Sequence, residues 1–205
     1  MKHFIKISFF LGLFVVVASQ AYSQIEIRQY EGKPLSPFDR DYDNSIKGPQ
    51  TVDINKYKLS VTGLVQQPLS LAYNEILALP SVTKAITLNC VEGWYEYLLF
   101  KGVRLVDVLK NAKPKKGIQT VIFYAADGYS SSLDYKFVID NNIMLAYEIN
   151  GKKLDSVRGF PLQVVAESKY GYKWVKWVTH IEVSDKPYVG YWENLGYDNE
   201  ANITN

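Results

Sequence analysis

Short apolar segments with the length and alternation of β-strands recur along this chain, and this pattern constrains its fold more than any other feature. In residues 57–61 apolar and polar side chains alternate, which is the period of a strand with one buried face. Further strands are predicted at residues 85–90, 119–125, 143–149 and 174–183. Two short helices are predicted, one after Ser70 as N-cap and ending near Pro80, the other at 104–111. We therefore expect an α+β fold with mixed sheets and short helices.

The size and composition of the chain indicate one domain that follows an export signal. With 205 residues, 47% of them hydrophobic, the chain has enough apolar side chains for one core. Two lysines precede an apolar run at 7–18, and the small residues Ala21 and Ser23 follow at positions that a signal peptidase reads. We expect a signal peptide at 1–23, a mature domain at 24–205, and a periplasmic or extracellular location. The apolar run is shorter than the roughly 20 residues that cross a bilayer, so no membrane span is expected after signal removal.

The charge balance gives no indication of a nucleic-acid partner. The predicted signal carries two of the 23 Lys and Arg residues, so the rest of the chain has as many basic residues as its 21 acidic ones. Binding to nucleic acid or to an anionic membrane surface requires clustered excess positive charge. We therefore expect no nucleic-acid partner.

Cys90 is the only cysteine, so its use is limited to a few possibilities. A lone thiol cannot form an internal disulfide, so in an exported protein it is either packed in the core or used chemically. Core packing is the common fate of free cysteine, and Cys90 alone favours it. A thiol redox protein is disfavoured, because the chain has no second cysteine and no adjacent basic residue to activate this one.

The sequence around Cys90 reads LNCVEGW at 88–94, and FKGVRL follows at 100–105. Other segments accompany it in order: NSIKGP at 44–49, DGY at 127–129, NG at 150–151, GFPL at 159–162 and YGYKWVKW at 170–177. Together they cover most of the chain after residue 40, and they resemble the molybdopterin-dependent oxidoreductases of the sulfite oxidase family. This resemblance implies the sulfite-oxidase-type molybdopterin-binding fold.

The resemblance also implies a cofactor, molybdenum-molybdopterin without a nucleotide extension, and a reaction, two-electron oxygen-atom transfer on a small-molecule substrate. Cys90 matches the cysteine that is the sole protein ligand of the metal, and a thiolate suits this soft-ligand role. Tyr129 matches an active-site tyrosine whose phenol donates a hydrogen bond. The positions that match cofactor-contacting segments are Asn44, Ser132, Arg158, Trp174, Val175 and Lys176. An external electron-transfer partner, such as a cytochrome or a membrane haem subunit, is implied as well.

Two departures from the family pattern stand out. Gln163 replaces an arginine that is common after the Gly-Phe-Pro turn, and Arg158 is our candidate to supply the missing charge. No arginine pair precedes the apolar run, although enzymes that load this cofactor usually leave the cytoplasm under a twin-arginine signal. The alternative function is a metal-free binding module on the same scaffold. It would use the aromatic surface and the tail from Tyr188 to Tyr197 to hold a ligand or partner.

The predicted last strand gives Lys176 a particular place. Val175 and Trp177 fall on its core face, whereas Trp174 and Lys176 fall on the opposite face, where the lysine is placed to meet an anionic cofactor group. An ordinary solvated strand face is the plain structural alternative.

The substrate stays open at this point. Sulfite oxidation favours several cations in the site, for which Arg40, Arg104 and Arg158 are candidates, whereas sulfoxide reduction favours an open aromatic-lined pocket. Signatures of zinc proteases, nucleotide-binding loops, serine hydrolases and haem attachment are all absent from the sequence.

Overall fold

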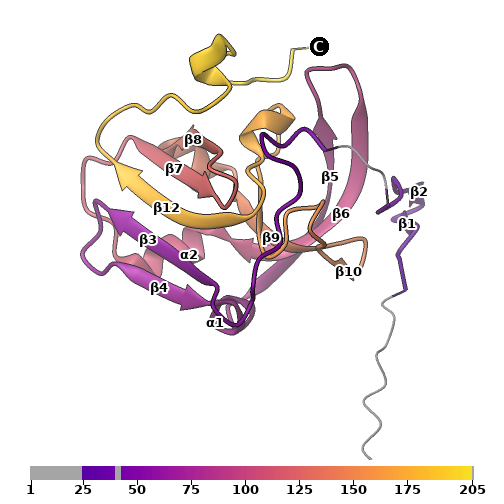
Figure 1. Cartoon of the computed structure of the whole chain (residues 1–205), viewed down its shortest axis with the longest axis horizontal. Helices are drawn as coiled ribbons and strands as arrows, with labels where there is room; N and C mark the ends of the chain where they lie inside the picture. The colour runs from indigo at the N-terminus through magenta and orange to yellow at the C-terminus, as the bar shows by residue number, and fades with distance from the viewer. Residues whose placement is uncertain (1–24, 40–42, 205) are drawn as a thin grey trace, which may run out of the picture.

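Two five-stranded sheets and three short α-helices are the main elements of the part of the chain that the computed structural model describes, residues 25–39 and 43–204 (Figure 1). The predicted signal peptide at 1–23 and the candidate cation Arg40 lie outside the described residues. No helix within the described ranges is long and apolar enough to cross a membrane. The expected α+β fold with mixed sheets and short helices is confirmed.

The first sheet is antiparallel and has the order β10-β9-β6-β5, with β11 also paired to β9. Its strands are β5 (Ser81–Asn89), β6 (Tyr95–Arg104), β9 (Met144–Ile149), β10 (Lys152–Lys153) and β11 (Gln163–Val165). The β5–β6 hairpin is the long pair at the right of Figure 1. Since β5 ends at Asn89, the hairpin turn begins at Cys90.

The second sheet has the order β4-β3-β12-β7-β8, and its one parallel pair is β3 with β12. Its strands are β3 (Lys58–Gly63), β4 (Leu69–Ala72), β7 (Thr120–Ala125), β8 (Ser130–Asp134) and β12 (Val178–Ser184). A separate small hairpin joins β1 (Gln29–Tyr30) to β2 (Lys33–Pro34). The sheet therefore brings the last strand of the chain, β12, beside its first long strand, β3.

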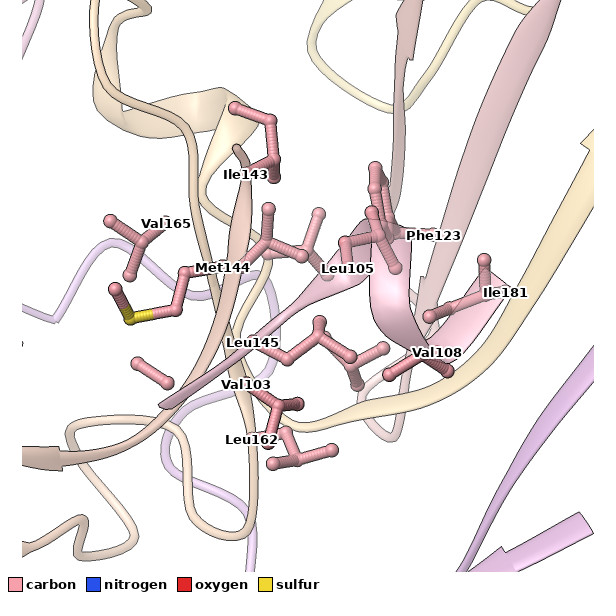
Figure 2. Packing of buried hydrophobic residues seen from close by; sticks show 14 of the residues in the cluster. Val103, Leu105, Val108, Phe123, Ile143, Met144, Leu145, Leu162, Val165 and Ile181 are labelled. Atoms are coloured by element: carbon pink, nitrogen blue, oxygen red, sulfur yellow. The ribbon is translucent and has the colours of Figure 1, made fainter. Parts of the chain in front are cut away.

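The core lies between the sheets and is completed by helices. The helices are α1 (Tyr73–Leu77), α2 (Leu105–Ala112) and α3 (Tyr135–Asp140), with short 3-10 turns at η1 (Gly171–Lys173) and η2 (Glu193–Leu195). Figure 2 shows Val103 of β6 and Leu145 of β9 packed near Val108 of α2, with Phe123 and Ile181 of the second sheet on the far side. All five are buried, so one continuous core supports both sheets.

Two sequence predictions about elements were wrong. Ser70 is not an N-cap: it pairs with Ser60 across β3 and β4, and the helix begins only at Tyr73. The backbone N–H of Ala72 is bonded instead by the Glu75 carboxylate at 2.7 Å, which caps the helix from within its first turn.

The predicted last strand at 174–183 begins four residues late, at Val178. Trp177 adopts a left-handed backbone conformation with φ +49°, which interrupts the alternation. Trp174 consequently does not face outward with Lys176. It is 3% exposed, and its ring packs edge-on against Phe100, with the centroids 5.6 Å apart.

Candidate active site

A cavity of about 380 Å³ opens where the β5–β6 turn, the β7–β8 turn and the segment from η1 to β12 meet. The N-terminal arm (residues 25–39 and 43–50) and the C-terminal segment (residues 185–204) complete its wall. The wall includes every predicted site residue except Ser132: Asn44, Cys90, Tyr129, Arg158, Trp174, Val175 and Lys176. Residues that are far apart in the sequence are thus gathered around one space.

Cys90 lies at the start of a tight turn and lines this cavity. Its backbone N–H donates to the carbonyl of Trp94 at 2.9 Å, and its carbonyl accepts from Gly93 at 3.1 Å. The side chain is half-buried, so the residue is not a core cysteine. Burial raises the pKa of the thiol. Burial therefore favours the neutral thiol, whereas a bound metal ion would deprotonate it.

Glu92 organises the polar groups around Cys90. Its carboxylate accepts from Trp94 Nε1 at 2.9 Å and from Asn44 Nδ2 at 3.2 Å, and the Cys90 sulfur lies 3.8 Å away. The bonds from Trp94 and Asn44 lower the pKa of Glu92, so this carboxylate is ionised. Glu92 was quoted in the motif but not predicted as a site residue. Its part in this hydrogen-bond network depends on Asn44, which is distant in the sequence and reaches Glu92 only in the folded chain.

Tyr129 and Asp127 come from the turn between β7 and β8. The Tyr129 hydroxyl donates to the carbonyl of Tyr172 at 2.5 Å, and burial raises its pKa far above the usual value. Asp127 accepts from the backbone N–H of Tyr129 through Oδ1 at 2.9 Å. Asp127 is 2% exposed, and its other oxygen, Oδ2, has no hydrogen-bond partner among the described residues. The cavity wall therefore holds a buried acceptor without a donor.

The two cations of the cavity have different surroundings. Arg158 forms a bidentate pair with Glu96, at 2.7 and 2.9 Å, and also donates to the carbonyls of Phe38 and Pro37. Lys176 has a looser partner, Asp43 at 3.5 Å. Burial lowers the pKa of Lys176, and the Asp43 carboxylate opposes that shift.

The structure leaves Ser132 outside the cavity and adds residues that were not predicted. The Ser132 hydroxyl donates to the carbonyl of Tyr188 at 2.9 Å, and the residue is 3% exposed. Trp192 and Tyr197 instead complete the wall from the C-terminal segment. Their aromatic character was noted in the sequence, but nothing there placed them beside Cys90.

Residues 46–192 match the family described as the oxidoreductase molybdopterin binding domain. This match spans more than half of the chain. The chain belongs to this family. It is a molybdopterin oxidoreductase of the sulfite oxidase type, and its cofactor is molybdenum-molybdopterin.

Several known proteins are similar to this chain. The uncharacterized oxidoreductase YuiH of Bacillus subtilis is 32% identical over 150 residues, which cover 73% of this chain and 76% of that protein. The putative protein-methionine-sulfoxide reductase subunit YedZ1 of Azospira oryzae is 31% identical over 147 residues, covering 72% of this chain and 56% of that protein. Among solved structures, the sulfane dehydrogenase SoxCD of Paracoccus pantotrophus aligns with a TM-score of 0.65 at 25% identity, over 68% of this chain and 41% of that one.

The residues of this cavity fit the molybdopterin cofactor. Cys90 presents the soft sulfur donor that the metal requires. The unpartnered Oδ2 of Asp127 is an acceptor for an N–H group of a pterin. Lys176 would be the cation for the phosphate, because its nearest carboxylate oxygen is no closer than 3.5 Å. The groups on the wall thus suit a metal ligand, a pterin acceptor and a phosphate partner for one molecule.

Proposed function

We propose that this molybdopterin oxidoreductase transfers an oxygen atom to or from a small substrate, with Cys90 as the protein ligand of molybdenum. The observation that carries the proposal is the position of the Cys90 thiol on a cavity wall that also holds Asn44, Glu92 and Lys176. The bound cofactor supplies two-electron oxygen-atom transfer chemistry. Asn44, Trp174, Val175 and Lys176 hold it in this proposal. Ser132 contributes indirectly, by fixing the β8 backbone.

The charges of the cavity favour a neutral substrate over an anion. Arg158 is engaged by Glu96, and Lys176 is assigned to the phosphate. Arg104 is paired with Asp107 and does not line the cavity. The ionised Glu92 lies beside Cys90, where it repels anions such as sulfite. No unengaged cation remains among the described wall residues to bind a substrate anion.

A sulfoxide is the neutral substrate that best fits this wall. The aromatic residues Tyr129, Trp94 and Trp192 line the cavity, and they suit the apolar groups on a sulfoxide sulfur. Relatives named as methionine-sulfoxide reductase proteins support this assignment. In the reaction the sulfur–oxygen bond breaks, two electrons and two protons are taken up, and a thioether and water leave.

Each chain residue has a limited task in this reaction. The Tyr129 hydroxyl, now bonded to the Tyr172 carbonyl, is oriented at the cavity wall and keeps its proton because of its raised pKa. It is therefore a hydrogen-bond donor throughout the physiological pH range. The aromatic wall limits the entry of water around the substrate.

We infer that the protein acts after export, with electrons supplied by another protein. The predicted signal peptide at 1–23 supports a periplasmic or extracellular location. With one cysteine the chain has no haem attachment motif, so a cytochrome or membrane haem subunit is the proposed electron donor. The relative named as a reductase subunit supports a partner of this kind.

Metal analysis of protein isolated from its native envelope tests the proposed function. Wild type is expected to contain near-stoichiometric molybdenum and pterin, and Cys90→Ser is expected to lose metal and activity together. With reduced methyl viologen as donor, wild type is expected to reduce a sulfoxide, and with ferricyanide as acceptor it is expected not to oxidise sulfite. Native protein without molybdenum, together with unchanged function in Cys90→Ser, would establish the metal-free binding module instead.

A further inference from the structure

The C-terminal segment, residues 185–204, forms one wall of the cavity although it adds no strand to either large sheet. In Figure 1 it is the yellow chain that leaves β12 and runs along the top of the molecule. The ring centroids of Trp192 and Tyr197 lie 5.4 Å apart, and those of Tyr197 and Tyr172 lie 5.2 Å apart. The aromatic wall therefore depends on how this segment is fastened to the domain.

A buried ion pair fastens it. Lys173 Nζ lies 2.5 Å from Glu193 Oε1, and the two side chains are 0% and 1% exposed. The same ammonium donates to the Ser132 carbonyl at 3.0 Å and to Asn199 Oδ1 at 3.2 Å. The Ser131 hydroxyl also donates to Glu193 Oε1. One ammonium thus joins η1, β8, η2 and the chain beyond η2.

The energetics of such a pair indicate a role in positioning. Removing two charges from water costs about as much as their attraction returns, so apolar residues of similar volume are often equally stable. What apolar residues do not reproduce is the fixed direction of several hydrogen bonds. The neighbours of the pair along the chain, Tyr172, Trp174 and Trp192, all line the cavity. The pair therefore lies directly behind the wall.

We propose that Lys173 and Glu193 are positioning residues that hold Trp192 and Tyr197 in the cavity wall. Through this wall they determine which sulfoxide substituents the cavity prefers. The proposal rests on sulfoxide reduction as the function. An aromatic wall held in one place favours a sulfoxide with an aryl or long alkyl group. A displaced wall loses that preference, and a small sulfoxide is affected much less.

The test compares cofactor-loaded, full-length variants on two sulfoxides. The double variant Lys173→Met with Glu193→Leu removes both charges without leaving one buried and unpaired, so it is expected to fold. Glu193→Gln keeps an oxygen acceptor for Lys173 and Ser131, but it leaves the buried Lys173 charge without a counter-charge and is therefore expected to be less stable than wild type. Glu200→Gln is the matched control. Glu200 lies on the same C-terminal segment, and its carboxylate pairs with Lys169 at 3.6 Å, but its side chain is 67% exposed.

Two measurements are made on each protein: the ratio of kcat/KM for methyl p-tolyl sulfoxide to that for dimethyl sulfoxide, and hydrogen exchange of residues 188–200. In the double variant the ratio is expected to fall about tenfold. Exchange in this segment is expected to accelerate about tenfold as well. Glu193→Gln, although less stable, is expected to keep a ratio near that of wild type because the acceptor stays in place, and Glu200→Gln is expected to match wild type in both measurements. A merely destabilised enzyme would lose both activities in parallel and keep the ratio.

An unchanged ratio with unchanged exchange in the double variant would overturn the proposal, as would a parallel loss of both activities. If wild type reduces neither sulfoxide, the proposed function fails. Hydrogen exchange alone then tests whether the ion pair positions the C-terminal segment. In that case faster exchange confined to 188–200 supports the positioning role, and exchange equal to wild type overturns it.

Discussion

Arg158 illustrates how the partners of a single residue decide what it does. Its position in the sequence made it the candidate to replace the charge that Gln163 lacks. In the structure its guanidinium is held by Glu96 and by two carbonyls of the N-terminal arm. The pair is buried, with 9% and 1% of the side chains exposed. Arg158 therefore connects the arm to β6, and the phosphate is better assigned to Lys176.

Breaking this pair is expected to destabilise the protein strongly. Glu96→Gln leaves the Arg158 charge buried without a counter-charge, which costs about 3–5 kcal/mol. The matched control is Glu148→Gln, whose partner Lys101 is 40% exposed, and its loss is expected to stay below about 1 kcal/mol. Urea unfolding measures both. Equal midpoints for the two variants would contradict the importance of the buried pair.

Tyr57 gives stability a defined dependence on pH. Its hydroxyl donates to the Val178 carbonyl at 2.5 Å, the residue is 5% exposed, and burial raises its pKa well above 10.0. Above pH 10 the unfolded chain loses this proton while the folded chain keeps it, so the free energy of unfolding falls as pH rises. The expected slope is about 1.4 kcal/mol per pH unit for this site.

The measurement for Tyr57 is urea unfolding between pH 8 and pH 11, with wild type compared to Tyr57→Phe. The difference between the two proteins isolates this site from the lysines that titrate in the same range. Wild type is expected to lose its advantage over Tyr57→Phe progressively above pH 10. A difference that does not vary with pH would show that the folded-state pKa is not raised.

At the scale of elements, the sequence predicted those whose pattern is local. Strands β3, β7 and β9 and helix α2 have clear apolar periodicity, and all were predicted. Strand β8 was missed because its start, Ser130-Ser131-Ser132, is polar but buried by the C-terminal segment. The false cap at Ser70 arose because pairing with β3 outweighs local capping preference. Tertiary contacts account for each of these errors.

The junction after β3 is expected to require glycine. Gly63 has φ +87°, and a Cβ there would lie 2.1 Å from the Val183 carbonyl oxygen of the parallel partner β12. Gly63→Ala is therefore expected to cost more than about 3 kcal/mol, because backbone strain and a backbone clash combine. Gly117→Ala is the control: its φ is +89°, but nothing lies within 4 Å of the added Cβ. Its expected cost is about 1 kcal/mol.

Thermal or urea unfolding of the two glycine variants distinguishes strain from clash. A large loss confined to Gly63→Ala supports a close approach of β3 and β12 at this point. Similar losses in both variants would mean that the left-handed backbone alone limits substitution, and that the parallel pair tolerates a side chain here.

At the scale of the whole molecule, the site could be predicted from sequence only in part. Cys90, Tyr129 and Lys176 lie in recognisable motifs and do line one cavity. Asp127 and Glu92 were not predicted, because an orphaned oxygen and a three-way hydrogen-bond network exist only after folding. Trp192 comes from a segment outside both large sheets, so no strand pattern places it at the site.

This assembly from distant segments predicts that the cofactor links them energetically. A group that binds only the folded cavity stabilises it by about 4 kcal/mol when present at a thousand times its dissociation constant. The gain is expected mainly in the loops at residues 43–47, 90–94 and 171–177, each of which contributes residues to the cavity wall. Strands β3 and β7 are already held by the core and are expected to change only with global stability.

Hydrogen exchange of cofactor-loaded wild type against cofactor-free Cys90→Ser measures this linkage, with cofactor-free wild type as the control for the mutation itself. Under native conditions, slower exchange in the three loops of the loaded protein is expected, with little difference between the two cofactor-free proteins. Uniform protection of every segment would mean that the domain opens only as a whole. The loops would then have no independent motion for the cofactor to restrain, and the cavity would be preformed before the cofactor enters.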